Sequence, residues 1–362
     1  MQKEHVTVYR QADKFAGWPA NYGMWAWEDE IVVGFTQCTH QAGAGFHARR
    51  NDLPAYPWQA RSLNGGCTWQ TVPTPAPSPG GRGFSADEHM VADLRVATAI
   101  ASGLEPLPRP CPGGIDFAHP DFALMCARTG LGTGTQAWFY ISYDRARTWQ
   151  GPYALPDFGL PGIEARTDYL VNSTSDCMLF LTASRDSGAE GAGVFLARTT
   201  DAGATFEFVS WVTNSPENYL LMPASVRVDE RTLLTAVRCI AGGDQIEAAA
   251  TWIDLFESTD NGRTWRQSSR PVPEVGSVGN PPALIRLRDG RLCLTYGYRA
   301  VPFGIRARLS EDGGKSWGEV IHLRDDGGCS DLGYSRTIQR SDGTLVTTYY
   351  FNEHPATERY IA

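Results

Sequence analysis

The sequence has few charged residues and no excess of positive charge. Charged side chains make up 20% of the 362 residues, against about a quarter in a typical soluble protein. The 32 Lys and Arg against 40 Asp and Glu leave a net charge of −8. A general attraction to nucleic acid or to anionic lipid is therefore excluded, and any anion site must be local. We expect neither a nucleic-acid nor a membrane partner.

Long apolar runs and paired cysteines are also missing. No window of about 18 apolar residues occurs, and the first ten residues lack the apolar core of a signal peptide. We expect a cytoplasmic protein, or a secreted or periplasmic one if a leader was removed. The eight cysteines are scattered singly with no Cys-x-x-Cys pair. We therefore expect small free thiols in the core, with no metal and no other cofactor.

Turn-forming and aromatic residues are abundant instead. The chain has 38 Gly, 23 Pro, 11 Trp, 14 Tyr and 15 Phe. Frequent turns combined with many aromatic side chains are typical of short, closely connected strands rather than of long helices. The composition therefore predicts an all-β protein.

An eight-residue pattern repeats along the chain. It reads Ser/Thr-x-Asp-x-Gly-x-Thr/Ser-aromatic and occurs in full at 199–206, 258–265 and 310–317. Two degenerate copies precede these, with Asn64 in the Asp position of 62–69 and Ala146 in the Gly position of 142–149. Asp or Asn accepts hydrogen bonds from its own turn, Gly supplies a positive φ, and the aromatic residue packs between units. These turns are predicted to be scaffold, and their Asp residues are not candidates for catalysis.

The spacing of the turns predicts a ring of sheets. Successive turns begin 52 to 80 residues apart, and six apolar strand pairs occur along the chain. This spacing indicates a six-bladed β-propeller of four-stranded antiparallel blades in one domain, 1–362. Residues 5–9 alternate in polarity and are predicted to complete the sixth blade, which removes the free sheet edges. A Pro- and Gly-rich segment at about 72–114 is predicted to be a loop inserted between the first two units.

The repeated turn resembles the Asp-box, and the chain resembles the six-bladed propellers of the sialidase (neuraminidase) superfamily. The resemblance implies a retaining exo-glycosidase. In that family three Arg bind the sugar carboxylate, a Tyr assisted by a Glu is the nucleophile, and an Asp is the acid/base. The segment 332–343 is similar to the strand that carries the family's Tyr, which makes Tyr334 the candidate nucleophile. Arg336 and Arg306 would supply positive charge, and Arg238 matches a family Arg at the end of an apolar strand.

Two family features are missing from the sequence. Met222 and Pro223 stand where the family has its Glu, and the segment 18–25 has no Arg in place of the family's Arg-Ile-Pro. We expect Arg166 to supply a cationic group from another blade.

The acid/base has more than one candidate. Asp52 matches the family position and His47 is the alternative, because imidazole exchanges protons near neutral pH. His119, Asp121 and Asp168 precede strands of the second and third units, and we expect them to project toward the same central mouth of the ring.

Three functions follow from this set of residues. The first is a hydrolase of sialidase type that removes a terminal acidic sugar from glycans. The second is a propeller glycosidase or lyase acting on a uronate or rhamnose-uronate unit, with His119 as the acid/base. The third is a glycan-binding propeller without catalysis. A carbohydrate partner is expected in each case, and the sequence leaves the oligomeric state open.

Overall fold

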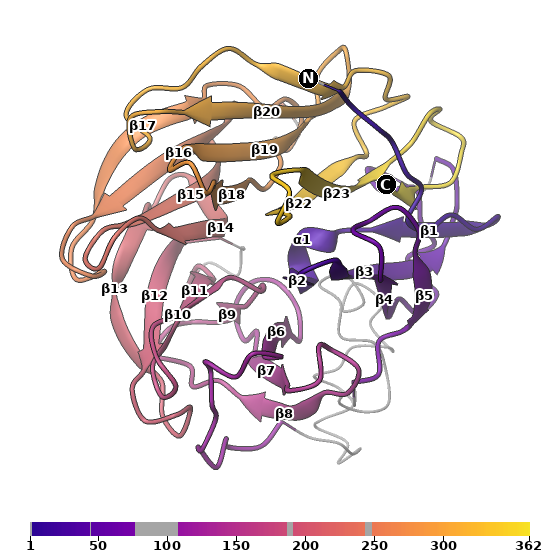
Figure 1. The fold of residues 1–362 in the computed structure, drawn as a ribbon. Helices are drawn as coiled ribbons and strands as arrows, with labels where there is room; N and C mark the ends of the chain where they lie inside the picture. The colour runs from indigo at the N-terminus through magenta and orange to yellow at the C-terminus, as the bar shows by residue number, and fades with distance from the viewer. Residues whose placement is uncertain (1, 44, 77–107, 187–190, 243–247) are drawn as a thin grey trace.

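A computed structural model describes residues 2–43, 45–76, 108–186, 191–242 and 248–362 of the chain. Six antiparallel sheets are arranged around a central axis, so that the predicted six-bladed propeller is confirmed (Figure 1). The blades have three to five strands each in the described residues, rather than four throughout. Most of the predicted inserted loop, at 77–107, lies outside the described residues.

The first three blades differ most from the regular plan. Blade 1 consists of β1 (Lys14–Gly17), β2 (Met24–Trp27), β3 (Glu30–Thr39), β4 (Tyr56–Ser62) and β5 (Gln70–Pro73). Blade 2 consists of β6 (Ala123–Arg128), β7 (Ala137–Ser142) and β8 (Gln150–Ala154). Blade 3 consists of β9 (Ile163–Glu164), β10 (Tyr169–Val171), β11 (Cys177–Ala183), β12 (Gly193–Thr199) and β13 (Glu207–Asn214). In blades 1 and 3 the innermost strand is split in two, because β1 and β2 both pair with β3, and β9 and β10 both pair with β11.

The last three blades follow the plan more closely. Blade 4 consists of β14 (Tyr219–Arg227), β15 (Leu233–Ile240), β16 (Thr251–Ser258) and β17 (Arg266–Val272). Blade 5 consists of β18 (Ala283–Arg286), β19 (Leu292–Tyr298), β20 (Gly304–Ser310) and β21 (Ile321–Arg324). Blade 6 consists of β22 (Gly333–Gln339), β23 (Leu345–Phe351) and the short β24 (Tyr360–Ile361).

The N-terminal segment closes the ring, as predicted. Val8 N donates to Ile361 O at 2.8 Å, and Ile361 N donates to Tyr9 O at 2.9 Å, which adds the segment to the outer side of β24. The Tyr9 ring packs against Phe35 and Trp58 of blade 1, with ring centroids 5.1 and 5.5 Å apart. The segment around Tyr9 therefore pairs with the C-terminal strand in blade 6, whereas the residues before it run on toward blade 5, where Lys3 donates to the His322 carbonyl (Figure 1).

The five repeated turns have the predicted structural role. In the turn of blade 4, Asp260 accepts hydrogen bonds from the Thr264 main-chain N–H at 2.9 Å and from its hydroxyl at 2.6 Å. Gly262 has a φ of 86°. The indole N–H of Trp265 donates to the Ser210 hydroxyl of blade 3 at 3.1 Å, so the aromatic residue joins neighbouring blades.

The degenerate turns keep this geometry with other residues. Asn64 accepts from the Thr68 main-chain N–H and donates its own N–H to the Thr68 hydroxyl, both at 2.9 Å. Ala146 adopts a φ of 60° in the place of glycine. The amide therefore replaces the carboxylate without loss of the turn.

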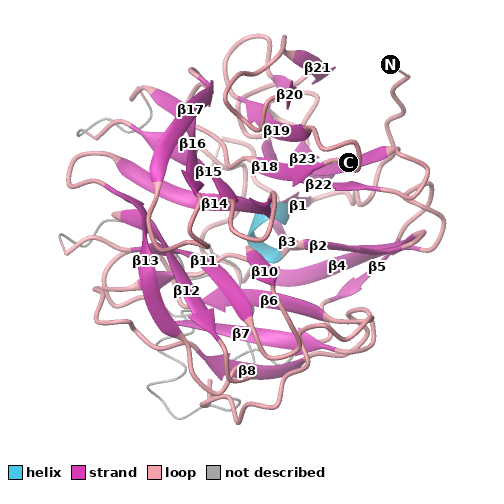
Figure 2. Cartoon of the chain, turned by 60° about the vertical axis from the view of Figure 1, so that its left-hand side comes forward, coloured by secondary structure: helices cyan, strands magenta, loops and turns pink. Residues whose placement is uncertain are grey.

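The described residues contain free cysteines and one short helix, as the composition led us to expect. All eight cysteines are free thiols, and Cys38, Cys126, Cys177, Cys239 and Cys293 are buried. The short helix α1 (Pro19–Tyr22) lies near the centre of the ring among the inner strands (Figure 2). No helix in the described part of the chain has the length and apolar character needed to cross a membrane.

The Asp-box carboxylates predict a specific sensitivity to acid. Hydrogen bonds from the Ser316 hydroxyl and N–H lower the pKa of Asp312 to about 2, against about 3.9 in an unfolded chain. This group therefore stabilises the fold above about pH 4, and the contribution is lost as the pH falls toward about 2. Asp312→Asn should retain the turn, as Asn64 does, and lose less unfolding free energy over that pH range than the unmodified protein, as measured by urea denaturation.

The reciprocal substitution is the control. Asn64→Asp introduces a titrating carboxylate into the matching turn of blade 1 and should increase the loss of stability over the same pH range. If the free energy of unfolding fell by the same amount with pH in all three proteins, the Asp-box carboxylate would not be the source of the acid sensitivity.

Candidate active site

The Asp-boxes define the two ends of the ring. In blades 1 to 5 an Asp-box joins the two outermost strands of the blade, so all five turns lie at one end, which we call the Asp-box end. The opposite end, which we call the mouth, contains the starts of the innermost strands and the ends of the second strands. The strand that carries a candidate residue, and its position along that strand, therefore show whether the residue lies at the mouth or at the Asp-box end.

Four strained residues lie in, between or before the innermost strands of their blades. Trp18, Met222, Val278 and Tyr334 belong to blades 1, 4, 5 and 6, and their φ values lie between 55° and 59°. This conformation is unusual for residues other than glycine, particularly for a β-branched residue, and costs of order 1–3 kcal/mol each. Positive φ also occurs in the Asp-box turns, at Ala146, Ala202 and Asn261, where it has a structural role. Outside such turns strain is typical of functional sites, which makes the mouth a candidate.

The guanidinium of Arg238 contacts three of these strained residues. Arg238 is buried and donates to the Val278 carbonyl. Its Nη1 lies 3.4 Å from Met222 Sδ and 3.4 Å from the Tyr334 hydroxyl. The prediction that Arg238 and Tyr334 lie together at the mouth is confirmed by this contact.

A second group at the mouth is a histidine paired with a buried carboxylate. His47 Nδ1 lies 2.7 Å from Oδ1 of Asp331. Asp331 also accepts hydrogen bonds from Ala48 N at 3.0 Å, the Tyr350 hydroxyl at 3.0 Å and Arg359 Nε at 2.8 Å. Burial alone would raise the pKa of Asp331, but His47, Arg359 and the Ala48 N–H hold the pKa well below its usual range. Asp331 is therefore ionised and fixes Nδ1 of His47 as the donor.

The remaining nitrogen of His47 is available to a ligand. The side chain is 23% exposed, and the ring packs edge-on against Trp18 and Phe46, with centroids 5.0 and 4.9 Å away. Among the described residues none hydrogen-bonds to Nε2.

Tyr350 and Arg299 connect this pair to Tyr334. The Tyr350 ring centroid lies 5.9 Å from that of Tyr334, and Arg299 Nη2 donates to the Tyr350 hydroxyl at 2.8 Å. The Arg299 guanidinium carbon lies 5.6 Å from the Tyr334 ring centroid. His47, Asp331 and Tyr334 therefore belong to one cluster.

The arginines at the mouth connect one blade to the next. Arg128 of blade 2 donates to the carbonyl of Ala165 in blade 3 at 2.8 Å. Arg299, after the second strand of blade 5, donates to the carbonyl of Leu332, before blade 6, at 3.0 Å. Arg128 and Arg299 both follow an apolar second strand, as Arg238 does. The pattern that identified Arg238 in the sequence was therefore sufficient to find all three.

Asp52 is poorly suited to act as a general acid. Its carboxylate is 63% exposed and forms a two-pronged ion pair with Arg50. The hydrogen bonds from Arg50 lower the pKa of Asp52, whereas a general acid needs a raised pKa. His47, the other sequence candidate, is the one joined to the cluster.

The expectation that His119 and Asp121 project toward the mouth is wrong. They precede β6, which begins opposite Ser142 of the Asp-box and therefore starts at the Asp-box end. Asp121 pairs with Arg145 of that turn at 2.6 Å. The prediction failed because β6 pairs with β7, the strand that enters the Asp-box, and so occupies the position that the second strand has in the four-stranded blades; the described residues of blade 2 contain no strand inside β6.

Arg336 and Asp168 lie near the axis but have structural partners. Arg336 donates to the carbonyls of Ala20 in α1, at 2.6 Å, and of Thr167. A register shift between Gly333 and Arg336 interrupts the regular alternation of β22, on which the prediction that Arg336 shares a strand face with Tyr334 depended. The Asp168 carboxylate accepts from the Ser225 hydroxyl at 2.7 Å, and burial raises the pKa of Asp168 to about 6.

The two other predicted arginines, Arg166 and Arg306, lie in different parts of the ring. Arg166 is buried near the axis, donates to the Asn21 side chain at 3.2 Å and lies 3.8 Å from Glu164. It therefore anchors α1. Arg306 lies on β20, the third strand of blade 5, over the Tyr298 ring at 3.2 Å from its centroid. The structure does not bring Arg306 to the central cluster.

A family model described as BNR repeat-like domain matches residues 123–347. The chain belongs to this BNR repeat-like family. The match covers blades 2 to 5 and most of the inner two strands of blade 6. The sequence resemblance to sialidase-type propellers with Asp-box repeats is thereby confirmed.

Solved structures share the fold of this BNR repeat-like protein. A protein of unknown function from Dyadobacter fermentans superposes with a TM-score of 0.70 at 19% identity, covering 99% of this chain and 97% of that chain. An α-L-arabinanase from Penicillium chrysogenum complexed with arabinobiose gives 0.59 at 12% identity, with 98% and 96% covered. A Hadza microbial sialidase gives 0.56 at 12% identity, with 96% and 65% covered. At these identities the likeness shows the fold alone, and no curated protein matches the sequence.

The burial of Asp331 predicts a large stability effect. Asp331→Ala would leave buried Arg359 without its carboxylate partner, so the free energy of unfolding should fall by about 3–5 kcal/mol. Asp52→Ala also removes an arginine partner, but at an exposed position, and should change stability by less than about 1 kcal/mol. Urea denaturation of both variants at neutral pH tests the difference, and equal losses would refute it.

Proposed function

We propose that the mouth binds and hydrolyses a glycoside that ends in an acidic sugar, with His47 as the proton carrier. The observation that carries the proposal is the pair of His47 and buried Asp331, which leaves Nε2 of His47 without a partner among the described residues and is joined to Tyr334 through Tyr350. A histidine oriented by a carboxylate is a common general acid/base.

The reaction requires one proton to move in each direction. Protonated His47 gives its Nε2 proton to the glycosidic oxygen as the bond from that oxygen to the sugar breaks. Water then adds its hydroxyl to the anomeric carbon and returns a proton to His47. Asp331 remains ionised throughout and stabilises the imidazolium, which is the role that its hydrogen bonds with Arg359 and Tyr350 support.

The charge of the mouth favours an anionic substrate. Arg49, Arg128, Arg166, Arg238 and Arg299 are all buried at this end of the ring, although the chain as a whole carries −8. A local excess of positive charge raises the local concentration of anions. The fold is shared with a sialidase and with an arabinanase, and of their two sugars sialic acid is the anionic one.

A second candidate is elimination from a uronate, which a specific contact favours. Met222 lies beside Arg238 and the Tyr334 hydroxyl, and no carboxylate among the described residues hydrogen-bonds to that hydroxyl. In elimination neutral His47 removes the proton next to the sugar carboxylate, the C–O bond breaks, and Tyr334 protonates the departing oxygen. Nearby arginine charge stabilises the carboxylate as that proton leaves.

A substrate panel separates these possibilities. The protein is incubated with an aryl α-sialoside, an aryl glucuronide, an aryl arabinofuranoside and a uronate-containing polysaccharide. Release from an acidic glycoside and not from the neutral arabinoside supports hydrolysis, and ultraviolet absorbance of an unsaturated product identifies elimination. Saturable glycan binding without any turnover would overturn both and leave a binding propeller.

The two histidines give a matched test of the proton carrier. His47→Gln should lower kcat by about 10²–10⁴-fold, because general acid/base catalysis contributes that much. His119→Gln, at the Asp-box end, should leave kcat and KM unchanged. Steady-state kinetics on the best substrate of the panel compares them, and a larger loss for His119→Gln would reverse the assignment.

Tyr334→Phe measures the contribution of the phenol. A covalent role in a retaining reaction predicts loss of turnover, with little change in KM. A role for the ring alone predicts nearly full activity, and that result would exclude Tyr334 as nucleophile.

A further inference from the structure

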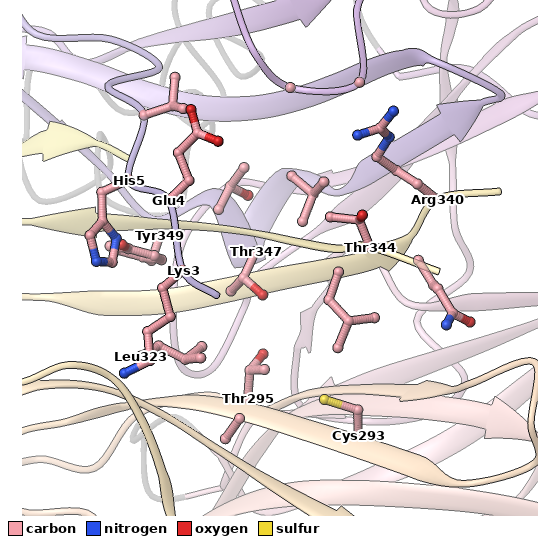
Figure 3. A pocket seen from close by; sticks show the side chains of 18 of the residues that line it. Lys3, Glu4, His5, Cys293, Thr295, Leu323, Arg340, Thr344, Thr347 and Tyr349 are labelled. Atoms are coloured by element: carbon pink, nitrogen blue, oxygen red, sulfur yellow. The ribbon is translucent and has the colours of Figure 1, made fainter. Parts of the chain in front are cut away.

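A cleft runs along the outer part of blade 6, away from the cluster at the mouth. It has a volume of about 720 Å³ and lies between blades 5, 6 and 1 (Figure 3). Residues 2–6 of the N-terminal segment lie along it, together with residues 343–349 in and before β23. Leu309 of blade 5 and Trp69 of blade 1 face it from the neighbouring blades.

One side of the cleft is a strand edge with which no described residue pairs. Tyr349 exchanges both main-chain hydrogen bonds with Ala362, each at 2.9 Å. Main-chain groups of alternate residues in a strand point to the same side, so those of Thr347 and Leu345 point into the cleft. The short β24 pairs only with Tyr350 and Phe351, and so does not reach them.

The opposite side is the N-terminal segment. It pairs with Ile361 through Val8 and Tyr9 and then continues along the cleft. Figure 3 shows Lys3, Glu4 and His5 on one side and Thr344 and Thr347 across from them. In blades 4 and 5 a third strand of eight or seven residues occupies the equivalent position, whereas β24 has two. The cleft therefore corresponds to most of one missing strand.

The lining specifies the chemistry of an occupant. Leu309, Leu323 and Val346 supply apolar surface, and Leu345 is 37% exposed. Two arginines, Arg291 and Arg340, lie at the Asp-box end of the cleft. Both already pair with exposed aspartates, Arg291 with Asp289 at 2.6 Å and Arg340 with Asp29 at 3.1 Å. Exposed ion pairs of this kind are weak, so a carboxylate of an occupant would compete with these aspartates. A strand that runs antiparallel to β23 would place its C-terminal end near these two charges.

We propose that blade 6 binds an extended segment of another polypeptide by strand addition. The segment has apolar residues at alternate positions and carboxylates toward its C-terminal end. Its main chain pairs with Leu345 and Thr347, its apolar side chains fill the cleft, and its carboxylates meet Arg291 and Arg340. Main-chain pairing provides affinity, and the side-chain positions provide selectivity.

A peptide from this chain provides the probe. Residues 251–265, TWIDLFESTDNGRTW, form β16 and its Asp-box and combine buried Ile253 and Leu255 with acidic Glu257 and Asp260. Fluorescence anisotropy of the labelled peptide with the full chain should show saturable binding. A control peptide with Leu255→Pro and Phe256→Pro loses N–H donors on both sides and should bind at least about tenfold more weakly. Equal binding of the two peptides, or none by either, would overturn the proposal.

Variants of the protein locate the binding. Arg291→Glu should weaken the peptide at least about fivefold through loss of the charge pairing. Arg231→Glu changes the matching turn of blade 4 and should have no effect. Thr347→Pro removes a donor that faces the cleft and should weaken binding about tenfold.

Hydrogen exchange tests the same contact without a substitution. Added peptide should slow exchange at Leu345 and Thr347, and unchanged exchange there despite binding would overturn the proposal. Concentration-dependent self-association that protects these amides without peptide would show that a second copy is the occupant, and would also contradict it.

Discussion

Buried main-chain carbonyls near the axis of the ring need hydrogen-bond donors, and arginines supply them. An innermost strand has no neighbouring strand on its axial side, so carbonyls exposed by its bulges would be left unpaired at a substantial cost in free energy. Arg128, Arg238 and Arg299 each reach from one blade to the start of the next. Arg336 makes the same connection from blade 6 to α1. The junctions between these blades therefore depend on guanidinium groups as well as on apolar packing.

This arrangement links the stability of the ring to the chemistry at its mouth. The guanidinium that binds the Val278 carbonyl is the one beside the Tyr334 hydroxyl. Arg299 likewise supports Tyr350, which donates to Asp331 and so helps to orient His47. The same residues hold the blades together and set the positions of the reactive groups, which fits a site with little freedom to move.

The sequence was most informative about features that depend on contacts between residues close together in the chain. The Asp-box turns were predicted because their hydrogen bonds lie within eight residues, as in Asp260 and Thr264. Tyr334 was proposed because its segment resembles the strand entry that carries the family's Tyr, and Arg238 because it follows an apolar stretch; the structure brings the two side chains into contact. His119 was misplaced because strand order within a blade decides which end of the ring a residue occupies. The partner of His47 was missed because Asp331 is 284 residues away, and nothing in the local sequence of either residue indicates the contact.

The pairing of Tyr9 with Ile361 has a consequence for how the protein folds. The two residues are separated by nearly the whole chain. Among the described strand pairings, this one therefore joins residues that are very far apart in the sequence, and such contacts form slowly. During synthesis five blades can form before Ile361 leaves the ribosome, while the Tyr9 strand has no partner. An exposed strand edge in that interval favours pairing with other nascent chains. Ring closure therefore covers a strand edge that stays exposed until the residues around Ile361 are made.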